Sequence, residues 1–281
     1  MKSIDRVMAV IDPTTDRQLA LTRAMRIAEM SGASVHCLLC VSGEADTPDR
    51  EAFERVEVHR GELWLDSLIA PYQREGIEVT REVRFEPNWR DVMGVAAEAM
   101  NADLVVKSSF RHLTGQRLMK TSDWQLLRSA PCPVLLVKRP DLGASGRILA
   151  ALNIAAEDEA HRALNEEIIE TAKMALAARS DLELHAVNAY RGSDNFVHPP
   201  DLARKVGIDR SHAHAIDGAP ETVIPECAQA IRAELVVIGT VARRGVSGLV
   251  LGNTAERVLD KLDADVFVIV AGRNRTSSKA A

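Results

Sequence analysis

The sequence is poor in aromatic residues and has no long apolar segment. Aromatic side chains make up 4% of the 281 residues, and all three tryptophans, Trp64, Trp89 and Trp124, fall in the first half. No apolar run approaches the roughly 20 residues that a helix needs to cross a bilayer. Residues 1–6 also lack the apolar stretch of a signal peptide. We therefore expect a cytoplasmic protein that does not act at a membrane.

Positive charge is also in short supply. The chain has 35 Lys and Arg residues against 40 Asp and Glu residues, which gives a formal net charge of −5 at pH 7. Nonspecific binding to nucleic acid needs a basic surface, because phosphate groups must be neutralised. The charge balance therefore argues against nucleic acid as a partner.

Only four cysteines occur, and the one close pair does not indicate redox or metal chemistry. Cys37 and Cys40 have C-x-x-C spacing, but they lie in the apolar run 35–41, which is typical of a buried strand. Residues three apart on a strand point to opposite faces, so the two thiols cannot easily share a metal ion or a disulfide. We expect both to be small buried structural residues.

The motifs that would identify an enzyme are missing. The sequence contains no G-x-S-x-G, no H-E-x-x-H and no G-x-x-x-x-G-K-[ST], and no nucleophile stands beside an obvious base. We predict no catalytic residue and at most slow hydrolysis of ATP, because phosphoryl transfer depends mainly on positioning.

Histidines offer one candidate metal site. His212 and His214 stand two apart on an expected strand and so share a face, and His185 or His198 could complete a zinc site with them. In the sequence, no carboxylate or cysteine at a useful spacing accompanies the pair. We therefore expect two exposed strand histidines and predict no metal.

An internal repeat organises the chain. Residues 86–123 align with residues 217–254 at a constant offset of 131 and without a gap, and residues 6–12 align with residues 147–153. The repeated unit is a whole domain, and residues 139–146 between the copies are rich in Pro, Gly and Ser, as a linker is.

The repeat sets the predicted domain boundaries. We expect an N-terminal domain over residues 1–140, a C-terminal domain over residues 146–272 and a disordered tail over residues 273–281.

Each copy alternates strands with helices. In the first copy we expect five strands, at Val7–Ile11, Val35–Val41, Glu78–Phe85, Leu104–Lys107 and Val134–Val137. Helices are expected before Gly32 and over residues 49–76, 91–100 and 123–127. This alternation predicts two tandem, doubly wound, five-stranded parallel α/β domains, whose ligands bind beyond the carboxyl ends of the strands.

The second copy departs from this plan in one place. It has room for only one short helix, over Asp201–Val206, where the first copy has the long segment 49–76. One face of the second domain is therefore less covered, which leaves either a groove or partner surface, or merely a shortened loop.

The second copy resembles the universal stress protein family. The family's nucleotide motif is Gly-x2-Gly-x9-Gly-Ser/Thr, between the fourth strand and the last helix, and this chain reads Gly239-x2-Ala242-x9-Gly252-Asn253. Residues 129–137 look like the closing strand of the family, and the resemblance covers about residues 3–271. It is closest to the tandem E-type subgroup, which implies an adenine-nucleotide α-hydrolase-like fold and a role in stress resistance.

A glycine-rich loop that enters a helix can bind an anion through backbone N–H groups and the helix dipole. Gly252 would allow close approach, and Asn253 and Thr254 would stand at the helix start, where they could cap it or bind phosphate. Arg243 and Arg244 either reach phosphate oxygens or lie in a solvated loop.

The resemblance implies a ligand site in the C-terminal copy only. The ligand would be ATP, another nucleotide, or a nucleotide-linked or apolar molecule. The expected site residues are Asn153, Ala186, Ile238, Gly239, Thr240, Ala242, Gly252, Asn253 and Thr254. Two of them depart from the family pattern: Ala242 replaces a glycine, and Asn153 stands where nucleotide-binding members often have Asp.

The first copy has lost the motif. Ser108, Arg111 and Thr121 occupy the three glycine positions, and Lys107 ends the strand where an apolar residue is usual. Trp124 would fill the space that a nucleotide takes in the second copy. We predict that this copy does not bind ATP.

Family resemblance further implies that the two copies pair as a pseudo-dimer through Val134–Val137 and Val266–Val270, which would hide two sheet edges. Further homodimerisation is left open. The alternatives to a ligand binder are a ligand-free interaction module of the stress response and a weak ATPase.

Overall fold

A computed structural model of the chain describes two compact units. The described residues are 3–43, 49–109, 121–140, 146–156, 158–192, 196–241, 243–245, 248–250 and 253–271, and for residues 121, 241, 243–245, 248–250 and 253 only the backbone is described. Residues 3–109 and 121–137 belong to one unit and residues 138–271 to the other. The predicted tail, 273–281, lies outside the described residues.

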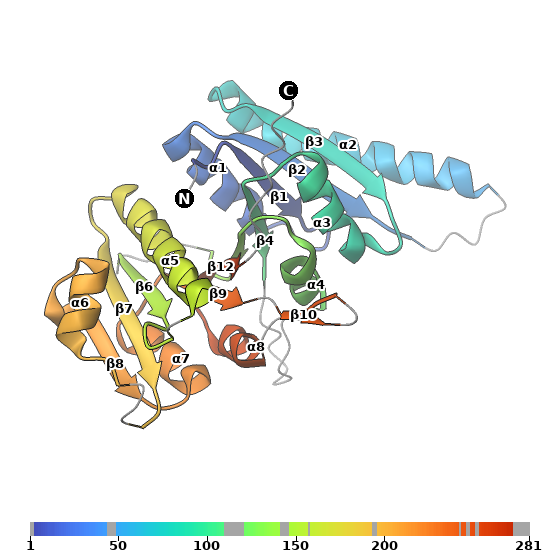
Figure 1. The fold of residues 1–281 in the computed structure, drawn as a ribbon. Helices are drawn as coiled ribbons and strands as arrows, with labels where there is room; N and C mark the ends of the chain where they lie inside the picture. Colours follow the sequence, from blue (N-terminus) through green and yellow to red (C-terminus); the bar gives the residue numbers. More distant parts are fainter. Residues whose placement is uncertain are drawn as a thin grey trace, which may run out of the picture. The chain divides into compact units, whose positions relative to one another are not determined.

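The N-terminal unit is a parallel sheet with helical crossovers (Figure 1). Its strands are β1 (Arg6–Ile11), β2 (Ser34–Val41), β3 (Val79–Phe85), β4 (Leu104–Ser108) and β5 (Val134–Val137), and they lie side by side in the order β3-β2-β1-β4-β5. Its helices are α1 (Leu19–Ser31), α2 (Arg50–Arg74), α3 (Trp89–Ala99) and α4 (Thr121–Ser129).

The C-terminal unit repeats this arrangement. Its strands are β6 (Arg147–Leu152), β7 (Glu183–Tyr190), β8 (Ala213–Asp217), β9 (Leu235–Val241) and β12 (Asp265–Ala271), in the order β12-β9-β6-β7-β8. Its helices are α5 (Glu159–Ala177), α6 (Pro199–Val206), α7 (Pro220–Ala230) and α8 (Asn253–Lys261), with a 3₁₀ turn, η2, at Arg210–His212. The predicted pair of doubly wound parallel sheets is thus confirmed.

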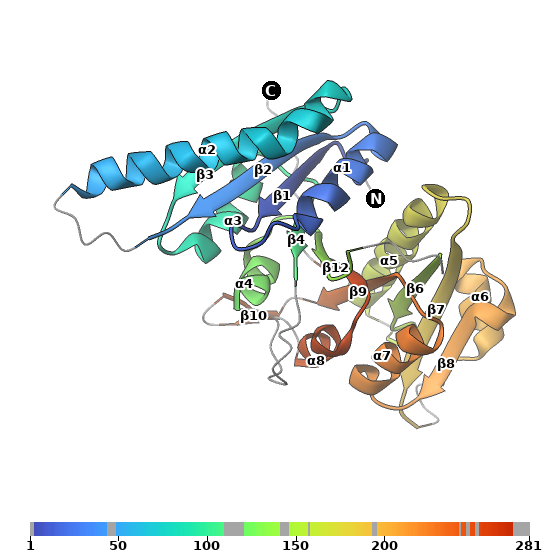
Figure 2. The same cartoon turned by 180° about the vertical axis from the view of Figure 1, so that it is seen from behind.

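Strand order explains why helices cover both faces of each sheet. The chain moves outward from β6 to β7 and β8, then crosses back to β9 and β12 on the other side of β6. Right-handed crossovers made in opposite directions place their helices on opposite faces. Consistent with this, α7 and α8 pack against each other, as Figure 2 shows from behind, and α3 packs against α4.

Apolar strands buried on both faces form the core, as the sequence pattern predicts. Every residue of β1 after Arg6 is buried, and so is every residue of β5. Helix α1 ends at Gly32, which adopts a left-handed φ of 74° and donates its N–H to Ala28 O.

The structure also differs from the predicted elements. A short antiparallel hairpin, β10 (Arg243–Gly245) with β11 (Gly248–Val250), follows β9 and was not expected. The predicted strand position of His212 is wrong, because this residue ends the turn η2, and only His214 lies on β8. The turn forms because the Asp209 side chain accepts the Ser211 N–H at 2.8 Å. The predicted pairing of Val134–Val137 with Val266–Val270 stays a prediction.

All four cysteines are free thiols. Burial raises the pKa of Cys37 to about 12 and, with weaker effects of nearby charges, that of Cys40 to about 11. Thiols with such a pKa stay protonated and unreactive at neutral pH. The predicted burial is confirmed for Cys37, whereas Cys40 is only half-buried.

Candidate functional site

The carboxyl edge of the C-terminal sheet is the first candidate site, because the strand order reverses there, between β6 and β9. β6 ends at Leu152, and the next residue, Asn153, has an exposed side chain. The side-chain amide of Asn165 on α5 forms hydrogen bonds with both the N–H and the carbonyl group of Asn153. The Asn153 N–H donates to Asn165 Oδ1 at 3.0 Å, and Asn165 Nδ2 donates to Asn153 O at 2.8 Å.

A second buried amide fixes the residue that follows. Ile154 donates its N–H to Asn188 Oδ1 of β7 at 2.9 Å, and Asn188 is completely buried. Asn165 and Asn188 thus support the turn after β6, and sequence reasoning missed both. Each is an isolated amide within an otherwise apolar helix face or strand. Such a residue could have been recognised from the sequence, because buried amides normally form hydrogen bonds with backbone groups.

Four of the predicted site residues lie on strands of the sheet: Ala186 on β7, and Ile238, Gly239 and Thr240 on β9. Ala186 is completely buried on β7 and pairs with Ala150, and Ile238 is 6% exposed on β9. Thr240 is buried as well, at 4% exposure. The side chains of these three residues are buried, whereas Asn153 and Thr254 have exposed side chains.

Gly239 is explained by packing against a helix. A Cβ atom at this position would lie 2.5 Å from Cγ of Leu164 on α5, which is closer than real side chains approach. Glycine lets α5 lie directly on the carboxyl end of β9. The sequence motif predicts that this glycine contacts the ligand. The contact with Leu164 by itself explains why a glycine stands at this position.

The start of α8 completes the edge. Asn253 is the first helical residue and Thr254 the second, so the backbone N–H groups of this turn belong to a helix N-terminus, which favours negative charge. Ala242 and Gly252 lie outside the described residues, and so do the side chains of Arg243, Arg244 and Asn253. Their predicted contacts with phosphate stay predictions.

The N-terminal unit fills the equivalent place with its own ion pair. Lys107 Nζ lies 2.6 Å from Asp123 Oδ1, and Ser109 Oγ donates to Asp123 Oδ2 at 2.7 Å. The side chains of Lys107 and Asp123 are 8% and 1% exposed. Asp123 lies in the first turn of α4, so its carboxylate already occupies the anion-favouring end of that helix.

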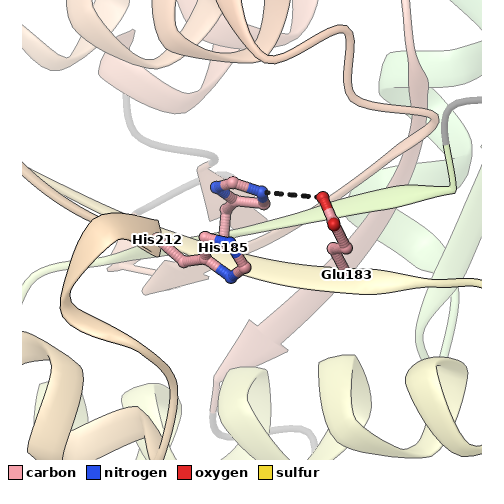
Figure 3. Close-up of side chains that lie close together, drawn as sticks. All are labelled: Glu183, His185 and His212. Atoms are coloured by element: carbon pink, nitrogen blue, oxygen red, sulfur yellow. Dashed lines mark ion pairs between the residues drawn. The ribbon is translucent and has the colours of Figure 1, made fainter.

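A separate polar cluster lies at the amino end of β7, opposite the edge described above. His185 of β7 stacks on His212 of η2 with ring centroids 4.2 Å apart, and Glu183 precedes His185 on the same strand face (Figure 3). The sequence prediction that no carboxylate accompanies these histidines is wrong, because residues i and i+2 of a strand share a face. His198, the other candidate, contacts Phe196 instead.

Within the described residues, no helix combines the length and apolar character that a bilayer crossing requires.

A model of the universal stress protein family matches the chain twice, over residues 3–138 and 150–270. The chain is 31% identical to universal stress protein E of Escherichia coli K12, with 98% of this chain and 97% of that protein covered. It is also 31% identical to a universal stress protein E homolog of Haemophilus influenzae, with 94% and 96% covered.

Solved structures show the same architecture. A functionally unknown protein from Pseudomonas aeruginosa PAO1 superposes with a TM-score of 0.79 at 30% identity, covering 96% of this chain and 93% of that one. A universal stress protein from Archaeoglobus fulgidus has a TM-score of 0.74 at 17% identity, covering 96% and 99%, which supports the fold alone.

Proposed function

Because the chain belongs to the universal stress protein family, we propose that it acts in stress resistance in the cytoplasm by binding a nucleotide, or a nucleotide-linked molecule, at the carboxyl edge of its C-terminal sheet. Relatives that match nearly its whole length carry the name universal stress protein E, which supports the physiological role. ATP is the ligand that the partial Gly239–Asn253 motif favours, and the proposal is binding with at most slow hydrolysis.

One contrast between the two copies carries the proposal. At the constant offset of 131, Asp123 of the first copy corresponds to Thr254 of the second. Asp123 is a buried carboxylate paired with Lys107, whereas Thr254 is an exposed hydroxyl in the first turn of α8. The first copy thus supplies its own anion to the helix N-terminus, and the second copy leaves that place for an external one.

The charges next to the helix N-terminus also support an anion site at the start of α8. Lys107 corresponds to Ile238, so the buried cation that neutralises Asp123 has no counterpart at this position of the second copy. An anion bound there would be held by backbone N–H groups and hydroxyls of the α8 turn, which is how glycine-rich loops bind phosphate.

The turn after β6 supplies a site for the neutral part of the ligand. Asn153 has an exposed amide, which can both donate and accept hydrogen bonds, as the edge of a nucleobase or a ribose requires. Its backbone is fixed by Asn165, so little ordering is needed when a ligand binds. Asn153 therefore replaces the more usual carboxylate with a neutral hydrogen-bonding group.

Thermal-shift and calorimetric titrations with Mg-ATP, ADP and AMP test the proposal. A ligand that binds only the folded protein stabilises it by about 2.7 kcal/mol at a hundred times its Kd. Thr254→Asp gives the second copy the carboxylate of the first, and we expect it to weaken nucleotide binding at least tenfold. The matched control is Ser180→Asp, which adds the same charge to an exposed residue before β7, at the opposite edge.

The outcomes separate the alternatives. Binding that is unchanged in Thr254→Asp would place the ligand elsewhere and overturn the assignment. If none of the three nucleotides binds, and mass spectrometry of the purified protein detects no nucleotide-linked molecule, the chain is a ligand-free interaction module. Phosphate release that exceeds the rate of a Gly252→Val variant would instead identify a weak ATPase.

A further inference from the structure

Three residues at the amino end of β7 bring metal-binding atoms together. Glu183 and His185 stand two apart on β7 and share a face. His212 ends the turn before β8, and β8 pairs with β7 so that Ala213 lies opposite Ala186, which places His212 beside His185. One ligand atom from each of these three residues lies within 4.8 Å of the others, in the arrangement of Figure 3.

We propose that Glu183, His185 and His212 form a binding site for a first-row divalent transition-metal ion, with Zn²⁺ as its best-fitting occupant. Two imidazoles and one carboxylate are the ligand set of several zinc sites that keep a fourth position open. The site is independent of the proposed nucleotide site, because it lies at the opposite end of the strands.

The atom that points to a ligand is Nε2 of His185. The side chain of His185 is 9% exposed, and Nε2 is buried and has no hydrogen-bond partner among the residues that the structure describes. The closest carboxylate oxygen, Oε2 of Glu183, lies 3.8 Å away, which is too far for a hydrogen bond. In a tetrahedral zinc site, bonds of about 2.0–2.1 Å separate neighbouring ligand atoms by about 3.3 Å, so a small side-chain rotation would admit the ion.

The first copy shows what this position looks like without such a site. Arg6 of β1 lies opposite Ser34 of β2, and the equivalent residue of the second copy, Arg147 of β6, lies opposite Glu183 of β7. Ser34 therefore corresponds to Glu183, and two residues further along each strand His36 corresponds to His185. His36 Nδ1 lies 2.9 Å from Thr80 Oγ1, and its Nε2 lies 3.2 Å from Glu82 Oε2.

Both ring nitrogens of His36 therefore have hydrogen-bond partners. In the second copy, His212 takes the place of Thr80 and His214 the place of Glu82, according to the pairing of β8 with β7. With histidines in place of these two partners, Nε2 of His185 has no hydrogen-bond donor or acceptor within the described part of the chain.

The protonation states also suit metal binding. Nδ1 of His185 lies 3.1 Å from Nε2 of His214. If the Nδ1–H of His185 donates this bond, Nε2 keeps its lone pair, as in metal sites whose histidines donate their other N–H to a neighbouring group. Burial, followed by the neighbouring His212 and His214, lowers the pKa of His185 to about 4, so the ring is neutral at neutral pH.

Arg147 orients the carboxylate. Its Nε donates to Glu183 Oε2 at 3.0 Å, and this hydrogen bond is the main reason that the pKa of Glu183 is lowered. Glu183 is therefore ionised, as a ligand must be. Two nitrogen ligands disfavour Mg²⁺ and Ca²⁺, which prefer oxygen, and favour Zn²⁺ and its neighbours in the first row.

Calorimetric titration with Zn²⁺ of the full chain, freed of any histidine tag and of bound metal, tests the proposal. We expect one ion per chain, at least a hundredfold weaker binding in His185→Gln and about tenfold weaker binding in Glu183→Gln. His214→Phe should weaken binding by about 10- to 100-fold, as outer-shell partners of metal sites usually do. The matched control is His36→Gln, the same change at the equivalent position of the first copy, which should bind as the wild type does.

Two further measurements keep the result interpretable. Because Glu183 is exposed, Glu183→Gln should fold normally, which circular dichroism checks, even if a change at buried His185 disturbs the fold. Co²⁺ bound to the wild type should give the visible absorption of a four-coordinate site, and Glu183→Gln should need about ten times more Co²⁺ to reach half of its maximum absorption. The proposal is wrong if no Zn²⁺ binds, or if Zn²⁺ binds equally well to Glu183→Gln and His185→Gln.

Discussion

The buried ion pair between Lys107 and Asp123 gives the sharpest test of how the first copy closes its site. Lys107→Met removes the cation but keeps a similar volume, so the Asp123 carboxylate stays buried at 1% exposure and retains the hydrogen bond from the Ser109 hydroxyl. At 2.6 Å and an effective dielectric constant of about 20, the lost attraction is on the order of 6 kcal/mol before desolvation is considered. Since removal of one partner of a buried pair typically costs about 3–5 kcal/mol, we expect a loss in that range.

Urea denaturation, followed by the fluorescence of the tryptophans, all of which lie in the first half, measures this loss. The double variant Lys107→Met/Asp123→Asn removes both charges and leaves the asparagine able to accept the Ser109 hydrogen bond. We expect it to recover at least half of the lost stability, because a neutral amide is far less costly to bury than an unpaired carboxylate.

Two results would refute the reasoning. A single variant that loses less than about 1 kcal/mol would behave like an exposed pair, and the carboxylate would then be solvated. A double variant no more stable than the single one would mean that the loss came from packing of the lysine stem. In either case the Asp123 carboxylate would not act as the buried anion at the N-terminus of α4. The comparison of Asp123 with the exposed Thr254 would then no longer support an anion site in the second copy.

Three further changes are predicted from single contacts. Gly239→Ala should cost about 1–3 kcal/mol in urea unfolding because its Cβ meets Leu164, and Leu164→Ala in the same chain should cost less than the two changes added together. Gly146→Ala should lower the melting temperature, because this residue has a φ of 58° and a Cβ would clash with the Asp181 carbonyl oxygen; an unchanged value would contradict the strain. The pKa of His185 falls from 6.5 to about 4 on folding, so the unfolded chain takes up the extra proton between these values. Stability of the metal-free protein should therefore fall by up to ~3 kcal/mol as the pH drops from 6.5 to 4, and His185→Gln should flatten this dependence.

Local sequence patterns determined the architecture. Short apolar runs such as Val134–Val137, alternating with amphipathic segments, are buried strands and crossover helices because each pattern matches one periodicity of burial. The repeat at a constant offset identified two copies of one domain, and lost glycines distinguished the first copy from the second. These features depend on neighbours in the chain, so a sequence alone can specify them.

Tertiary structure decided which side chains meet. Gly239 is fixed by Leu164, on a helix that precedes it by two strands, and no local pattern reveals that contact. In the sequence, Lys107 is an unexplained charge near the end of an apolar strand. In the structure, α4 places Asp123 beside it, and the two side chains form an ion pair. Pairing of β8 with β7 likewise set His212 beside His185. Such contacts depend on strand register and helix packing between distant segments, and the residue types alone do not encode them.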